Sequence, residues 1–159
     1  HLSQQGWQVS GWSNSAKHID GVHCHAGLAE LPLALAEADV LICLLPLTSE
    51  TTNLLNAETL AFCRQGVIFI NVARGAIVDD DALLAALQSG QVSAACLDVF
   101  RQEPLPAEHP YWQQPNVLVT PHISAVTNAQ TAVTQIVENY KRCMASLPMF
   151  NLIDQQRGY

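Results

Sequence analysis

Arg74, Glu103 and His122 have side chains that can do chemistry together, and each follows shortly after an apolar segment. The arginine guanidinium is a fixed fork of hydrogen-bond donors that matches a carboxylate or another planar anion. Histidine changes its charge near neutral pH and can transfer a proton. Taken singly, Arg74 can belong to a surface turn, Glu103 to a solvated loop, and His122 can be an ordinary loop histidine. The elements that carry the three residues decide whether they form one site.

Short apolar segments recur along the chain and are typical of β-strands. Val40–Leu45 is apolar at every position, as in a strand that is covered on both faces. Trp7–Trp12 is a first extended segment. Further strands are predicted over Val67–Ile70, Val92–Asp98 and Val117–Thr120.

Two helical segments are predicted in the first half of the chain. Leu28–Ala38 has a helical composition, and we expect Pro32 in or before its first turn because proline has no amide hydrogen to donate. Asn56 is expected to cap a short helix that runs through Cys63. Both segments lie next to a predicted strand, so strands and helices alternate here.

The second half of the chain continues the alternation with two more helices. Asp79–Ser89 begins with acidic residues, which the helix dipole favours, and Gly90 provides a stop. The three aspartates at its start could suggest Mg²⁺, but capping of the helix explains them better. The last helix carries apolar residues at steps of three and four between Val126 and Leu147.

Strands that alternate with helices predict an α/β fold, a Rossmann-type doubly wound parallel sheet. In such sheets the ligand binds beyond the carboxyl ends of the strands. Four consecutive strands are followed by a turn rich in proline and threonine, an arginine, an aspartate with a glutamate, and a histidine. These groups are Pro46–Thr51, Arg74, Asp98 with Glu103, and His122. Their convergence favours one functional site over separate structural explanations.

Three linked motifs resemble the signatures of the D-isomer-specific 2-hydroxyacid dehydrogenase family. They are Asn71–Gly75, Leu97–Phe100 followed by Glu103-Pro104, and Thr120–His122, and Leu45–Thr48 followed by Thr51 is similar to an earlier turn of that family. The order and spacing also fit, with 29 positions from Arg74 to Glu103 and 19 more to His122. The surroundings of Trp112 and residues 154–159 are most similar to the members that reduce glyoxylate and hydroxypyruvate.

The resemblance implies an oxidoreductase that transfers hydride from a nicotinamide cofactor to a small 2-keto acid, from glyoxylate or hydroxypyruvate to glycolate or glycerate. It implies that Arg74 binds the substrate carboxylate and polarised carbonyl. His122 is then the general acid that protonates the carbonyl oxygen. Glu103 is expected to hydrogen-bond the far ring nitrogen of His122 and to fix its tautomer.

The resemblance also implies which residues border the cofactor. Asp98 is expected beside the nicotinamide, together with the backbone around Val72 and Ala73, while Pro46 and Thr51 line the adenosine side. Small residues after the histidine allow close approach. The full set of expected cofactor-binding residues is Ser13, Asn14, Ser15, Lys17, Leu45, Pro46, Thr51, Val72, Ala73, Arg74, Asp98, Ser124 and Ala125.

The end of the first extended segment bears on the choice between NADP and NAD. NAD enzymes place an acidic residue there to hold the ribose hydroxyls. This chain has Ser13, Asn14, Ser15 and Lys17 instead, which could bind a 2′-phosphate. We therefore expect NADP, with NAD as the alternative because no arginine is present to decide it.

None of the eight glycines forms a Gly-x-Gly-x-x-Gly turn, which a dinucleotide fold places after its first strand. We therefore expect residues 1–147 to be a partial dinucleotide-binding domain that lacks this strand and loop. Residues 148–159 are expected to be a tail that returns toward a separate substrate domain, with the role of Arg157 left open. On this interpretation the chain alone is inactive.

Composition restricts the other classes of function. Hydrophobic residues make up 49% of the chain and charged residues 13%, which argues against a disordered protein. A net charge of −7 gives no basic surface for nucleic acid, and no apolar segment is long enough to span a membrane. The five cysteines are unpatterned, and no secretory signal is evident, so we expect reduced thiols and a cytoplasmic location. The resemblance to the family also implies a homodimer.

Two other functions remain open within the same fold: a phosphoglycerate dehydrogenase-like enzyme, and a dinucleotide-sensing, corepressor-type binding protein. A metal site is a further possibility at His18, His23, Cys24 and His25. Neighbouring residues of an extended segment point in opposite directions, and the usual ligand spacings are absent. A polar surface loop is therefore the favoured interpretation of this segment, and no metal is expected.

Overall fold

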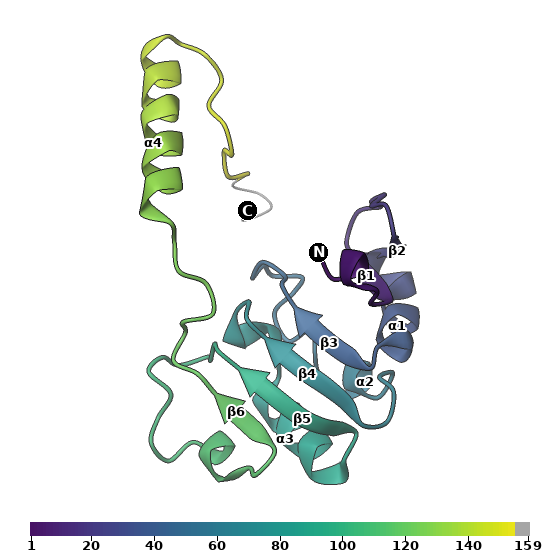
Figure 1. Ribbon diagram of the computed structural model, residues 1–159. Helices are drawn as coiled ribbons and strands as arrows, with labels where there is room; N and C mark the ends of the chain where they lie inside the picture. Colours follow the sequence, from purple (N-terminus) through teal and green to yellow (C-terminus); the bar gives the residue numbers. More distant parts are fainter. Residues whose placement is uncertain (155–159) are drawn as a thin grey trace. The chain divides into compact units, whose positions relative to one another are not determined.

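The computed structural model describes residues 1–154. Two units divide between Pro121 and His122, and each is described by itself. The first unit contains parallel strands and their helices, and the second contains one long helix (Figure 1). Residues 155–159, which include Arg157 and nearly all of the terminal motif, lie outside the described residues. The predicted domain boundary after residue 147 stays a prediction.

A sheet of four parallel strands is the centre of the first unit. Its strands are β3 (Val40–Cys43), β4 (Val67–Asn71), β5 (Val92–Leu97) and β6 (Val117–Val119), hydrogen-bonded in that order. All four were expected from the apolar segments, so the α/β fold with parallel strands is confirmed.

One prediction about β3 is wrong. The strand ends at Cys43 rather than Leu45, and its two faces differ, because Val40 and Ile42 are more than 40% exposed while Cys43 is buried. An unbroken apolar segment shows that both faces of a strand are apolar. It does not show that other residues of this chain cover both faces.

A second, two-stranded parallel sheet precedes the first. It pairs β1 (Val9–Ser13) with β2 (Val22–Ala26), and Trp12 lies opposite His25. The interpretation of the histidine segment as a polar surface loop is wrong for His23, Cys24 and His25, which belong to β2, and His25 is buried. His18 lies before the strand and is exposed. The alternating residues of β2 fit a strand with period two, which the polar composition concealed.

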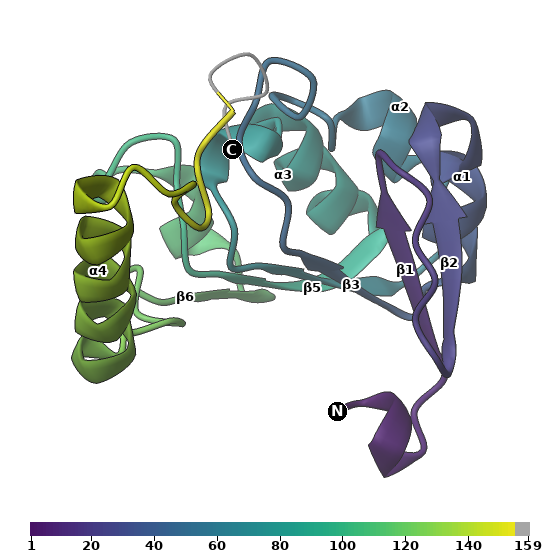
Figure 2. The ribbon, with the colours of Figure 1, turned by 90° about the horizontal axis from the view of Figure 1, so that it is seen from above.

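Three helices belong to the first unit: α1 (Gly27–Glu37), α2 (Ala57–Leu60) and α3 (Asp80–Ser89). Short 3-10 turns are η1 (Ser3–Gln5), η2 (Gly75–Ile77) and η3 (Pro110–Gln113). Figure 2 shows α2 and α3 on the same side of the four-stranded sheet. Between them and the sheet lies a core that includes Phe69, Ile77 and Leu83, all fully buried.

Local signals set the ends of these helices. Asn56 and Thr59 form a reciprocal capping box at the start of α2. The Asp79 side chain accepts a hydrogen bond from the amide of Ala82, which confirms the capping interpretation. Gly90 ends α3 with a positive φ of 76°.

Pro32 is not in the first turn of α1, as had been expected, but inside the helix. Its missing amide leaves the carbonyl of Leu28 without a helical partner. Leu28 is largely exposed, so water can hydrogen-bond that carbonyl in place of the missing amide.

The second unit is formed by α4 (Ala129–Met144) and the segment that follows it. The helix is shorter than the apolar stripe that predicted it and begins at the Asn128 cap. After α4 the chain turns back along it: Asn139 exchanges two hydrogen bonds with the Phe150 backbone, and the Arg142 guanidinium lies 4.0 Å from the Phe150 ring centroid. Within residues 1–154, no helix is long and apolar enough to cross a membrane.

Candidate active site

The carboxyl ends of the four central strands form one row. Cys43 pairs with Asn71, Asn71 with Leu97, and Leu97 with Val119, so the last residue of each strand lies beside that of its neighbour. The loops that leave this edge carry most of the predicted site residues (Figure 1). This is the edge at which parallel α/β sheets bind their ligands.

The loop after β4 is held by Asn71, which is 1% exposed. Its Oδ1 accepts a hydrogen bond from the amide of Ala73 (3.1 Å), and its Nδ2 donates to the carbonyl of Arg74 (3.2 Å). The Arg74 side chain also donates to the Ala73 carbonyl (2.6 Å). Arg74 is exposed at the end of this loop. Asn71 therefore fixes the backbone of Val72, Ala73 and Arg74, a role that no local pattern in the sequence indicates.

The loop after β5 packs directly on the loop after β4. A Cβ at Gly75 would lie 2.0 Å from the backbone carbon of Phe100, so only glycine fits there. Glu103 Oε1 accepts a hydrogen bond from the Phe100 amide (2.9 Å). The close approach at Gly75 thus brings the segments of Arg74 and Glu103 together. Within the sequence, the one signal for this contact is the glycine that directly follows Arg74.

Asp98 lies at the base of the same edge and is 1% exposed. Its Oδ1 accepts a hydrogen bond from the Thr120 hydroxyl (2.5 Å), and its amide donates to the Asn71 carbonyl (3.0 Å). Asp98 therefore ties together the ends of β4, β5 and β6. Its expected position beside a nicotinamide stays a prediction.

The turn after β3 is compact and held by threonine hydroxyls. Thr51 Oγ1 donates to the Pro46 carbonyl (2.7 Å) and accepts from the Thr48 amide (2.8 Å). These contacts follow Leu45 and give the predicted adenosine-side turn a defined shape. Threonine rather than valine occupies these positions because its hydroxyl makes the hydrogen bonds that hold the turn.

The loop after β1 contains the residues expected to select the cofactor. The Ser13 hydroxyl donates to the Ser15 carbonyl (2.8 Å), and Lys17 is exposed. Asn14 Nδ2 lies 3.4 Å from Glu50 Oε2. A carboxylate is therefore present near this loop, although Glu50 is 36 positions from Asn14 in the sequence.

His122 begins the second unit and has a positive φ of 55°. It is exposed, as are Ser124 and Ala125. Arg74 and Glu103 belong to the first unit, so the hydrogen bond expected between Glu103 and His122 stays a prediction.

Comparison with known proteins identifies the class. Residues 1–124 match the NAD binding domain of the D-isomer specific 2-hydroxyacid dehydrogenases. The chain belongs to this family, and the resemblance inferred from the three motifs is confirmed.

The curated relatives indicate which group of enzymes within the family the chain resembles. The chain is 43% identical to glyoxylate/hydroxypyruvate reductase A of Yersinia enterocolitica and 44% identical to that of Serratia proteamaculans, over 99% of this chain and 50% of each relative. It thus spans about half the length of the curated relatives it matches. These matches agree with the narrower resemblance drawn from Trp112 and residues 154–159.

Solved structures of two relatives share the fold. The D-isomer specific 2-hydroxyacid dehydrogenase of Xanthobacter autotrophicus Py2, in complex with NADPH and MES, is 49% identical with a TM-score of 0.97, over 99% of this chain and 65% of that one. An NADPH-dependent glyoxylate/hydroxypyruvate reductase of Sinorhizobium meliloti, in complex with NADP and sulfate, is 35% identical with a TM-score of 0.94, over 99% and 51%.

Proposed function

We propose that the enzyme containing this chain is an NADP-dependent reductase of small 2-keto acids, with glyoxylate and hydroxypyruvate as substrates. The observation that carries the proposal is the row of strand ends from Cys43 to Val119, which gathers the loops of the family motifs at one edge. Relatives named glyoxylate/hydroxypyruvate reductase A support the substrate class.

The residues at this edge fit a dinucleotide. Gly75 lets the loops after β4 and β5 approach closely, and Asn71 fixes the backbone at Ala73, so this part of the edge has a defined shape. The hydroxyls after β1 and the exposed Lys17 can hold a phosphate. Glu50 opposes a phosphate at the same loop, so the preference for NADP rests mainly on the relatives bound to NADPH and NADP.

The mechanism assigns a separate task to each charged residue. When bound, the reduced nicotinamide supplies the hydride that the carbonyl carbon of the keto acid accepts. Arg74 binds the substrate carboxylate and draws electron density from the carbonyl. His122 donates a proton to the carbonyl oxygen, and Glu103 holds the ring in the required tautomer.

The test is consumption of NADPH and NADH by the whole enzyme with glyoxylate, hydroxypyruvate and a bulky keto acid. Fast NADPH oxidation with the two small acids is the expected result. A preference for NADH would overturn the cofactor assignment and leave the three catalytic residues in place. Tight cofactor binding without turnover of any keto acid would favour a dinucleotide sensor instead, and turnover of a phosphorylated substrate alone would favour a phosphoglycerate dehydrogenase-like enzyme.

We also propose a cytoplasmic homodimer. All five cysteines lie in the described part of the chain and are free thiols, which fits a reducing compartment. Exposed apolar side chains on α4 could form part of a subunit interface: Val133, Ile136, Val137 and Tyr140. Light scattering of the whole enzyme gives its mass, and a monomeric mass would contradict the dimer.

A further inference from the structure

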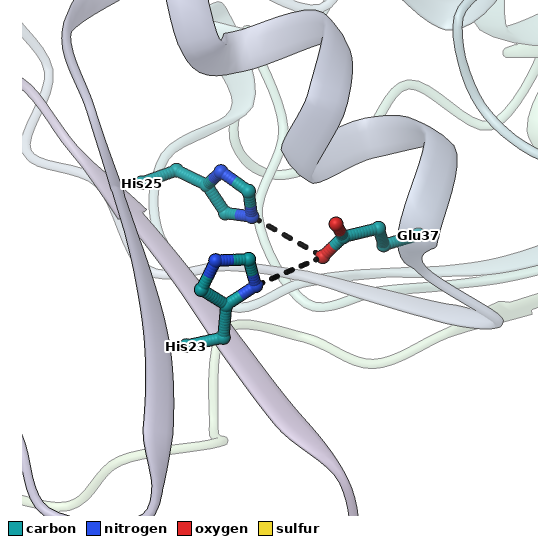
Figure 3. A group of neighbouring side chains, drawn as sticks. All are labelled: His23, His25 and Glu37. Atoms are coloured by element: carbon teal, nitrogen blue, oxygen red, sulfur yellow. Dashed lines mark hydrogen bonds and ion pairs between the residues drawn. The ribbon is translucent and has the colours of Figure 1, made fainter.

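His23, His25 and Glu37 form a cluster that the proposed reaction does not use (Figure 3). The two histidines are two positions apart on β2, so their side chains lie on the same face of the strand. Glu37 is the last residue of α1, which runs back along β2 and brings one carboxylate oxygen close to both rings (Figure 3). Two imidazoles and one carboxylate, ligands that bind transition metals, thus meet at one point.

The separations of the donor atoms suit a small metal ion. Glu37 Oε2 lies 3.2 Å from His25 Nε2 and 3.4 Å from His23 Nδ1. In a tetrahedral zinc site with bonds of about 2.1 Å, neighbouring ligand atoms lie about 3.4 Å apart. All three atoms lie within 4.8 Å of one another.

The exposure of the three side chains also fits a site with one open position. The His25 side chain is 6% exposed and is held by its surroundings, whereas those of His23 and Glu37 are 67% and 47% exposed. An ion held by these residues would be fixed on the buried side and open to water on the other. Zinc sites with two histidines and one glutamate keep such a fourth position for water.

We propose that His23 Nδ1, His25 Nε2 and the Glu37 carboxylate bind a divalent transition-metal ion of the Zn²⁺ type. The bound ion links β2 to the end of α1. Its ligands belong to β2 and α1, whereas Arg74 and Glu103 follow β4 and β5, and the ion takes no part in the proposed reduction.

The test is Zn²⁺ binding to the whole enzyme, measured in competition with a chromophoric chelator. One ion per chain is expected, and His23→Gln and Glu37→Gln should each weaken binding at least tenfold. Both replaced side chains are substantially exposed, so the variants should fold, which circular dichroism checks. His18→Gln is the matched control, because His18 is also exposed and also contacts a carboxylate, that of Asp20.

Substitution with Co²⁺ separates this site from a cysteine site. The expected spectrum has visible bands of a nitrogen and oxygen site without a thiolate charge-transfer band. A thiolate band that disappears in Cys24→Ser would overturn the proposal. It would also fail if Zn²⁺ bound without one-to-one stoichiometry, or if His23→Gln and Glu37→Gln bound as tightly as the unmodified protein.

Discussion

His122, Arg74 and Glu103 divide the proposed chemistry among three side chains, and neighbouring residues position two of them. Asn71 fixes the loop that ends at Arg74, and the Phe100 amide holds the Glu103 carboxylate. At this scale a substitution can remove either a reacting group or a group that holds the edge together. The two kinds are distinguishable because the first changes turnover and the second changes stability.

The first kind is represented by His122→Ala in the whole enzyme. Loss of the general acid should lower kcat with glyoxylate at least about 100-fold, the usual contribution of a positioned proton donor. NADPH binding should change little, and fluorescence titration measures it. His109→Ala is the control, since His109 caps the short turn η3 and packs against Tyr111 and has no role in the proposed reaction. Unchanged kcat in His122→Ala would remove the catalytic assignment.

The second kind is represented by Thr120→Val. The Thr120 hydroxyl donates to the buried Asp98 carboxylate, and valine has nearly the same shape without the donor. The free energy of unfolding should fall by about 1–3 kcal/mol, as for a lost hydrogen bond to a charged group. Urea denaturation measures the change. Thr52→Val should cost less than about 0.5 kcal/mol because its hydroxyl is exposed; equal effects would contradict the role of Thr120.

At the scale of elements, the contact between the loops after β4 and β5 depends on one residue without a side chain. Gly75→Ala places a Cβ against the Phe100 backbone, which cannot move without displacing Asp98 and Glu103. We expect a loss of at least about 3 kcal/mol in the free energy of unfolding.

Gly11→Ala is the matched control for this substitution. Its Cβ would meet only Val22 Cγ1, at 3.7 Å, in an ordinary contact. The two thermal unfolding curves should therefore differ clearly. If Gly75→Ala unfolded at the same temperature as Gly11→Ala, the proposed packing of the two loops would be wrong.

The sequence predicted elements well where a local pattern determines them. The apolar segments gave β3 to β6, and Asn56, Asp79 and Gly90 marked helix ends that the structure confirms. β2 was missed because its polar residues concealed a strand. Neighbouring residues of a strand point in opposite directions, but His23 and His25 are two positions apart and therefore share a face of β2.

Contacts between distant positions could not be predicted from local patterns. Motif resemblance selected Arg74 and Asp98, but it gave no sign that Thr120 holds Asp98 or that Glu50 lies beside Asn14. These pairs depend on the order of the strands and on the path of the turns. These pairs can be identified only from the folded structure.

At the scale of the whole molecule, stability comes from the core on the helix-covered side of the four-stranded sheet. The opposite side presents Val40, Ile42, Ile68 and Leu118, which are 41–61% exposed. Cys63 belongs to the covered side and is 6% exposed, near the end of α2. Because a buried thiolate is unfavourable, burial raises the pKa of the Cys63 thiol from 9.0 to about 11.

This shift makes the stability of the fold depend on pH in the alkaline range. Below pH 9 the Cys63 thiol is protonated in both the folded and the unfolded chain, so its contribution to stability is complete. As the pH rises from 9 toward 11, the thiol ionises more readily in the unfolded chain, and this contribution is lost. Tyr111, whose pKa is also raised by burial and by Asp80, adds to the loss above pH 10. The free energy of unfolding should therefore fall between pH 9 and 11.

Replacement of Cys63 measures how much its thiol contributes to this decrease in the free energy of unfolding. Cys63→Val should make the decline between pH 9 and 10 shallower, whereas Cys143→Ser should leave it unchanged because Cys143 is exposed. Urea denaturation across the pH range measures both. A decline that is as steep in Cys63→Val as in the unmodified protein would assign the loss to other groups, with Cys43, whose pKa is also raised by burial, the first to examine.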